Sequence, residues 1–180
     1  AELGGGGYDR ESGALPASTR VVTISGGDAG GLLARLADPE DSASLWAGAG
    51  GQLCVQFTDS DTYPVGPLSV PAGGRLELRS QRWQRPLLCP AASEVDARWR
   101  IRLWQGATLV LDGLAVQGGL TLAGSALGGD DASPAVTGVQ VVIRHSTLVP
   151  GGSLLPSGLP AAPDSPSIAA EVPSRTARRM

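Results

Sequence analysis

The chain has 180 residues, which is enough for one domain with a substantial core. Its net charge of −3 provides no general attraction to nucleic acid or anionic membranes, and no apolar run of about 18 residues is present to span a membrane. Hydrophobic residues make up 42% of the chain and aromatic residues only 4%, so aliphatic side chains must fill the core.

The N-terminal quarter predicts a lead-in followed by a cap. Residues 1–20 are rich in glycine and polar residues and are expected to be flexible, and a β-branched run after them predicts the first strand. Leucines at helical spacing within 29–37 predict a short helix, and Ser42 or Ser44 is expected to cap a second one. We interpret 21–51 as a first strand and a helical cap over the end of the structure that follows.

The middle of the chain alternates between short apolar runs and turn residues. Strands are predicted at 52–57, 68–70, 75–79, 86–89 and 98–104. A polar turn is predicted at 58–64. In the last of these strands Trp99, Ile101 and Leu103 share one face and the arginines share the other.

Two later segments repeat one pattern of strand, corner, strand, corner, strand. They occupy 107–124 and 139–155 and are separated by an irregular insertion at 124–138. A single Asp-Gly turn would also suit a hairpin, but the recurrence predicts successive coils of a parallel β-helix. An offset of 32 residues aligns the two coils and places Asp112 beside Arg144, as a surface ion pair.

The last part of the chain predicts little further structure. The final coil is expected to take its third strand from 153–155, and 167–172 predicts one more strand. The coils therefore span 52–172, and 173–180 is expected to be frayed. The chain begins with Ala and shows no signal peptide, so the sequence is compatible with a fragment or with a processed form.

The cysteines are expected to be unpaired. Cys54 and Cys89 both lie in apolar runs, and two cysteines are too few for a disulfide framework, so we expect buried free thiols.

The segment DSDTYPVGPLSVPAGGRLELRSQRWQRPLL at 59–88, together with the two repeated coils, resembles right-handed parallel β-helices of the pectate-lyase-like class. The order SLW, GG, QLCVQFTDSDTY is similar to uncharacterised bacterial β-helix proteins of phage-tail-like contractile systems. The resemblance implies an all-β solenoid and transfers little chemistry, because these motifs specify the fold rather than a reaction.

Enzymes of the class that the chain resembles cleave polysaccharide with calcium-bound aspartates and an arginine base, or with clustered carboxylates and a histidine. Neither pattern is complete in this sequence. The weak catalytic candidates are Asp130, Asp131, Arg144 and His145. The competing interpretation is a solvated acidic loop and a histidine at a coil corner.

The sequence contains no motif for a cofactor or a metal. It has no metal-spaced cysteine and histidine set, no nucleophile elbow and no phosphate-binding loop. Asp59 and Asp61 have oxygen ligands that suit calcium, but turn hydrogen bonds are the favoured interpretation.

One segment has an unusual composition. Residues 79–104 contain six of the fourteen arginines and three of the four tryptophans. The predicted ligand-binding residues are Arg100, Arg102 and Trp104, which would suit an anionic sugar or an acidic protein surface. Alternatively, the arginine stems only cover a strand while Trp83 and Trp99 pack at a seam.

These observations favour a non-enzymatic structural or binding module, as part of a phage-tail-like or cell-surface assembly. Other assembly proteins or an anionic polysaccharide are the expected partners. A fragment of a polysaccharide lyase or glycoside hydrolase is the alternative. A cytoplasmic assembly and an extracellular particle are both open as locations.

Overall fold

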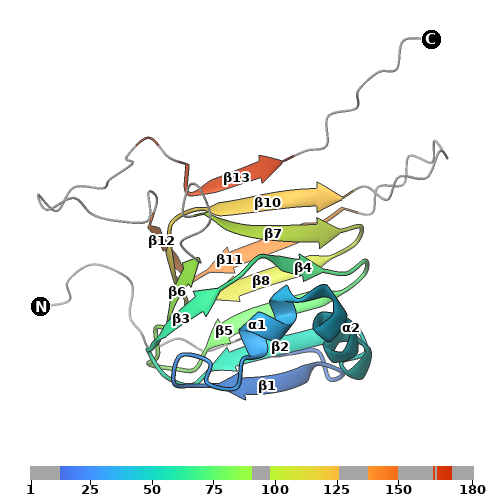
Figure 1. The fold of residues 1–180 in the computed structure, drawn as a ribbon, viewed down its shortest axis with the longest axis horizontal. Coiled ribbons are helices and arrows are strands. Elements are labelled where there is room, and N and C mark those ends of the chain that lie inside the picture. The colour runs from blue at the N-terminus through green and yellow to red at the C-terminus, as the bar shows by residue number, and fades with distance from the viewer. Residues whose placement is uncertain (1–12, 91–97, 126–137, 150–163, 165, 172–180) are drawn as a thin grey trace, which may run out of the picture.

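Each coil of the chain contains three strands, and the coils stack so that equivalent strands pair in parallel (Figure 1). The computed structural model describes residues 13–90, 98–125, 138–149, 164 and 166–171. Within them the strands form three parallel sheets, which we call sheets A, B and C. The fold is therefore a parallel β-helix, as the repeated pattern of short strands predicts.

Each coil contributes one strand to each sheet. Sheet A contains β1 (Arg20–Ile24), β2 (Gln52–Phe57), β5 (Arg75–Ser80), β8 (Thr108–Asp112) and β11 (Gln140–Arg144). Sheet B contains β3 (Thr62–Val65), β6 (Leu87–Pro90), β9 (Ala115–Gln117) and β12 (Thr147–Val149). Sheet C contains β4 (Leu68–Val70), β7 (Trp99–Trp104), β10 (Leu120–Ser125) and β13 (Ile168–Glu171).

The predicted register between the two repeated coils is confirmed. Leu109 pairs with Val141 and Leu111 with Ile143, in parallel, which excludes a hairpin between these strands. Asp112 pairs with Arg144 as the offset of 32 residues predicts.

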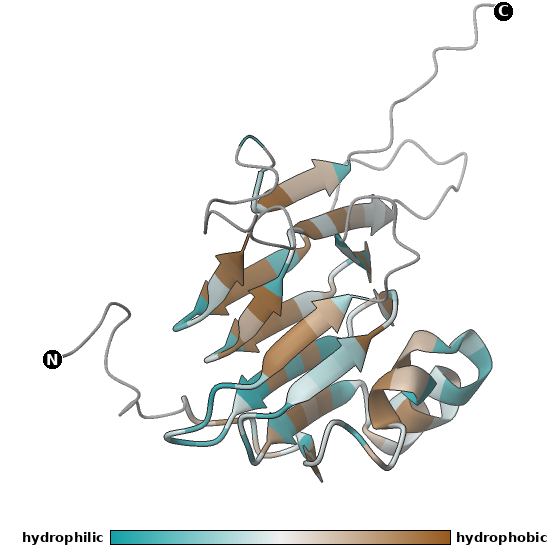
Figure 2. Cartoon of the chain, turned by 60° about the vertical axis from the view of Figure 1, so that its left-hand side comes forward, coloured by the Kyte–Doolittle hydropathy of each residue, from teal (hydrophilic) through white to brown (hydrophobic). Residues whose placement is uncertain are grey.

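Aliphatic side chains stack in ladders along the interior. In sheet A, Val55, Leu78, Leu111 and Ile143 follow one another from strand to strand, and the first three are fully buried. The hydropathy colouring in Figure 2 shows apolar residues recurring along successive strands. Each fully buried aliphatic side chain contributes about 1.5–3 kcal/mol, so the ladders are the main source of stability.

Two short helices precede the first full coil. They are α1 (Leu32–Ala37) and α2 (Pro39–Gly48). The prediction that Ser42 or Ser44 caps α2 is wrong. Asp38 is the cap, and its carboxylate accepts hydrogen bonds from the backbone N–H groups of Glu40 at 2.8 Å and Asp41 at 3.1 Å. Asp38 ends α1 and also caps α2, and proline suits the first position of α2 because it lacks the N–H that would go unpaired there.

The helices cover the N-terminal end of the β-helix. Strand β1 extends sheet A by one strand, and in the described part of the chain sheets B and C have no strand at that level. Helix α1 packs against β3 and β4 instead, beside α2, at the lower end of the stack in Figure 1. Leu33, Leu36 and Leu45 are buried in the same core as the ladders, so the pair closes this end of the core.

One local prediction needs correction. Residues 62–65 form strand β3 and not a turn, because Tyr63 and Val65 point into the core while Thr62 and Pro64 face outward. The strand predicted at 167–172 is confirmed as β13, which pairs with β10 in sheet C, whereas the strand expected at 153–155 lies outside the described residues.

Both cysteines are free, as predicted, but their surroundings differ. Cys54 is buried, whereas Cys89 is only half-buried and its thiol donates to Gln117 Oε1 at 2.9 Å. Burial raises the pKa of the Cys54 thiol to about 11 and also raises the pKa of Cys89.

Two neighbouring leucines of β6 test which side chains of this strand point into the core. Leu88 is fully buried between Tyr63 and Val116, and Leu87 lies on the outer face. We expect Leu88→Ala to lower the free energy of unfolding by about 2–5 kcal/mol and Leu87→Ala by less than about 1.5 kcal/mol. Urea denaturation measures both changes, and the opposite order would show that the strand faces are assigned wrongly.

The two thiols should react at different rates with an aromatic disulfide reagent. We expect native protein at pH 8 to release product from Cys89 first, and from Cys54 only as fast as the protein opens, because only the thiolate reacts. Single Cys54→Ser and Cys89→Ser variants assign each rate, and fast labelling of Cys54 in native protein would contradict its burial.

Candidate functional site

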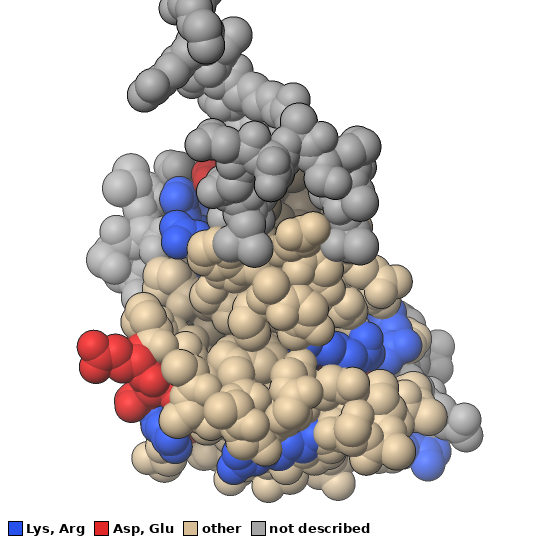
Figure 3. All heavy atoms as spheres, turned by 90° about the vertical axis from the view of Figure 1, so that its right-hand side faces the viewer, with Lys and Arg blue, Asp and Glu red and all other residues tan. Residues whose placement is uncertain are grey.

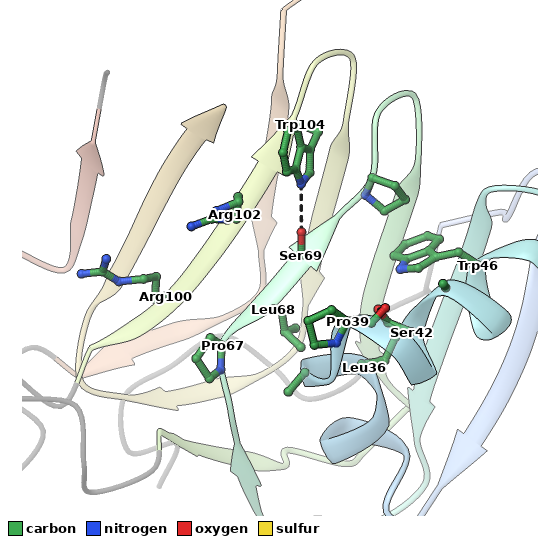
Figure 4. A pocket seen from close by; sticks show the side chains of 13 residues that line it. Leu36, Pro39, Ser42, Trp46, Pro67, Leu68, Ser69, Arg100, Arg102 and Trp104 are labelled. Carbon is green, nitrogen blue, oxygen red and sulfur yellow. Dashed lines mark hydrogen bonds between the residues drawn. The ribbon is translucent and has the colours of Figure 1, made fainter. Parts of the chain in front are cut away.

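A groove of about 500 Å³ lies between the helical cap and the outer face of sheet C (Figure 4). Its floor is β4, where the short side chain of Ser69 stands between Pro67 and Pro71. One wall comes from β7 and the other from the helices. This volume lies within the range of small-ligand and peptide-anchor sites.

The predicted binding residues form one wall of this groove. Arg100, Arg102 and Trp104 point outward from β7 because the alternate residues of the strand are buried in the core. Both arginines are exposed, and Trp104 is partly buried with its indole N–H donating to Ser69 Oγ at 3.0 Å. The structure thus brings the three residues together. Trp104 is partly covered, so less of its ring is available for stacking against a ligand than in a fully exposed tryptophan.

The two arginines of this wall have different partners. Arg100 Nη2 lies 3.5 Å from Glu171 Oε1 of β13, and both side chains are about half exposed, at 52% and 51%. Within the described residues no carboxylate or hydrogen-bond acceptor contacts the Arg102 guanidinium. Arg102 is therefore the cation of the groove that is available to a bound anion.

The opposite wall is apolar and was not predicted from the sequence. It comes from Leu36, Pro39 and Trp46, which approach β4 from the two helices (Figure 4). Trp46 is only 8% exposed, and its buried Nε1–H has no acceptor among the residues that the structure describes. A buried N–H without an acceptor destabilises the folded protein, and this wall contains one such donor.

Of the four weak catalytic candidates, the structure brings Arg144 and His145 together. Asp130 and Asp131 lie outside the described residues. Arg144 Nε and His145 Nδ1 contact the two oxygens of Asp112 at 3.0 and 2.9 Å. Asp112 is 1% exposed, so this ion pair is buried on its acidic side and is not the surface pair that was expected.

His145 occupies a coil corner, as one sequence interpretation expected. Its φ is 50°, and Gly113, its counterpart one coil earlier, has φ 76°. A histidine tolerates this left-handed conformation better than a bulky apolar residue does, and its contact with Asp112 holds it there. The geometry gives His145 a structural role at the corner.

A second buried carboxylate lies on the outer face of sheet A. Glu77 is 1% exposed and Arg75 Nη2 binds its Oε2 at 2.7 Å. Arg144 and Arg79 lie 3.7 and 4.0 Å from Oε1, which makes no hydrogen bond. The sequence pattern Arg-x-Glu-x-Arg on one strand face signals this cluster, but it does not reveal that the carboxylate is buried.

Asp59 makes the predicted turn hydrogen bonds. It accepts from the Tyr63 hydroxyl at 2.6 Å, the Gly26 N–H at 2.7 Å and the Asp61 N–H at 3.2 Å. The Tyr63 hydroxyl first, and then the backbone N–H of Gly26, hold the pKa of Asp59 below its ordinary value. The carboxylate thus stabilises the turn between β2 and β3.

Trp83 contradicts the expectation that Trp83 and Trp99 pack together at a seam. Trp99 is buried and donates its Nε1–H to the Gly66 carbonyl at 2.8 Å. Trp83 is 59% exposed in a left-handed turn with φ 69°, and the Arg82 guanidinium lies over its ring.

Comparison with known proteins gives no relative. No protein-family model, no curated protein and no solved structure matches the chain. Within the described residues no three histidine, cysteine or acidic side chains gather as metal ligands, and no helix there has the length and apolar content to cross a membrane. The groove brings the predicted binding residues Arg100, Arg102 and Trp104 together and is the candidate functional site.

The Asp59 turn makes stability depend on pH. Because the folded pKa of Asp59 is lowered, its contribution is present above the ordinary value of 3.8 and is lost as pH falls through the folded value. We expect Asp59→Ala to lower Tm by about 2–4 °C at pH 6, and this difference to shrink toward pH 2.5. Thermal unfolding followed by circular dichroism measures both.

Tyr63→Phe is the matched control for this prediction, because it removes the principal donor to Asp59 and keeps the buried ring. Tyr63→Phe should reduce the pH dependence of Tm that Asp59 causes, without abolishing it. A Tm difference between wild type and Asp59→Ala that is constant from pH 6 to pH 2.5 would contradict the assignment.

Proposed function

We propose that the protein is a non-enzymatic binding module whose groove holds an anionic partner. The observation that carries this proposal is the row of Arg100, Arg102 and Trp104 along one wall of a groove with an apolar opposite wall. An arginine beside an aromatic ring, at a partly water-excluded site, favours binding of carboxylates.

The scaffold supports this proposal because its parts are fixed to one another. Strand β7 lies between β4 and β10 in sheet C, and its inward residues are buried, so the arginine wall stands on a rigid element. Figure 3 shows the side of the molecule where β4, β7 and β10 end. Its arginine atoms form small patches among uncharged residues, and acidic atoms gather mainly at one edge.

An assembly is the proposed setting. The resemblance of the repeated coils to pectate-lyase-like β-helices, and of the order SLW, GG, QLCVQFTDSDTY to β-helix proteins of phage-tail-like systems, supports a rigid component of such a particle or of a cell-surface structure. A stacked solenoid offers a stiff surface with few moving parts, which suits a role in holding other proteins in place.

A polysaccharide lyase or hydrolase is the second candidate. It is favoured by the convergence of Arg144 and His145 on Asp112. It ranks below binding because both side chains use these contacts to hold a corner, and the Asp112 side chain is only 1% exposed.

Charge reversal in the groove tests the proposal. We expect wild-type protein to bind immobilised polyglutamate or polygalacturonate, more weakly at high salt, and Arg102→Glu to lower the affinity by about tenfold or more. Surface plasmon resonance measures the affinities. Arg35→Glu is the matched control, since Arg35 is exposed on α1 and does not line the groove.

Two results would overturn the proposal. One is the absence of binding to both polyanions, or binding that Arg102→Glu and Arg35→Glu weaken equally. The other is the release of new chain ends from polygalacturonate that disappears in His145→Ala, which would establish the enzymatic alternative.

A further inference from the structure

The two walls of the groove differ in chemistry along its whole length. Arg100 and Arg102 stand on the β7 side, and Leu36, Pro39 and Trp46 stand on the helical side (Figure 4). The floor between them is strand β4, which among the described strands pairs only with β7. A ligand that follows the floor must present anionic groups to one side and apolar groups to the other.

The basic wall has the spacing of an extended strand. Arg100 and Arg102 are two residues apart on β7, so their stems leave the backbone about 6.6–6.8 Å apart. Carboxylates two residues apart on an extended peptide have the same spacing, and the residues between them point to the opposite side. Glu171, carried by the strand β13, already places a carboxylate 3.5 Å from Arg100.

The helical wall does not suit a polysaccharide. Leu36 and Trp46 are almost completely buried, the unpaired Nε1–H of Trp46 is itself buried, and the Ser42 hydroxyl donates to the Pro39 carbonyl at 3.2 Å. Sugar hydroxyls placed against this wall would lose their hydrogen bonds to water without replacement. A peptide can instead place apolar side chains against this wall.

From this geometry we infer that the groove binds an extended segment of a partner protein in which apolar and acidic side chains alternate. The acidic side chains pair with Arg100 and Arg102, and the apolar side chains pack against Pro39 and Trp46. This inference rests on the proposed function, because it names the class of anionic partner that the same groove takes.

Synthetic peptides test the inference on the full chain. The probe is fluorescein-labelled Val-Glu-Val-Glu-Val-Glu, and its control is Val-Val-Val-Glu-Glu-Glu, with the same composition and charge. Fluorescence anisotropy should show that the alternating peptide binds at least about tenfold more tightly than the block peptide, because only alternation serves both walls.

Two variants of groove residues test whether the alternating peptide binds in the groove. Arg102→Ala removes the cation that has no partner among the described residues, and Ala43→Trp fills the groove from α2 without changing charge. Each should weaken binding of the alternating peptide by about tenfold or more. The matched controls are Arg35→Ala and Ala47→Trp, at exposed positions of the same helices outside the groove lining, and these should bind as wild type does.

The outcomes separate this inference from the proposed function. Equal binding of the two acidic peptides, or groove-dependent binding of polygalacturonate alone, overturns the inference and leaves the groove as an anion-binding site. If no anionic probe responds to Arg102→Ala and Ala43→Trp, both the inference and the proposed function are wrong.

Discussion

The parallel register between coils is the constraint on which the rest of the molecule depends. Each inward side chain must lie over an inward side chain of the previous coil, as Val55, Leu78 and Leu111 do. A slip by one residue would turn every such side chain outward and bring charged residues into the core. The same alternation determines what lies outside, so Arg100 and Arg102 line the groove because Ile101 is in the core.

The register also stacks charges on the outer face of sheet A. Glu77 and Asp112 are buried there, and arginines from their own or neighbouring strands bind them. Removing a carboxylate from water is expensive, and only well-placed cations offset the cost. A shifted register would separate these partners, so the buried pairs favour one alignment of the coils over its neighbours.

The sequence predicts the parts of this fold that recur and misses those that depend on a single long-range contact. The two repeated coils, the inward face of β7 and the outward arginines all follow from alternation, which is local. Strand β3 escaped prediction because only Tyr63 and Val65 carry its apolar signal and Pro64 stands between them. The start of α2 was misplaced because Asp38-Pro39 suits a helix end and a helix start alike.

For the groove, periodicity within one strand predicts the arginine wall, but nothing in the sequence indicates which sheet the helices approach. Leu36 and Trp46 precede Arg102 by more than fifty residues, and only packing brings them together. The helical cap consequently has two tasks: Leu36 and Trp46 seal the core and also form the groove. A ligand that binds there only in the folded state stabilises that state by an amount that grows with its concentration relative to its Kd, so occupancy and resistance to unfolding are thermodynamically linked. Substitutions at these two positions therefore cannot change affinity without also changing how firmly the end of the solenoid is closed.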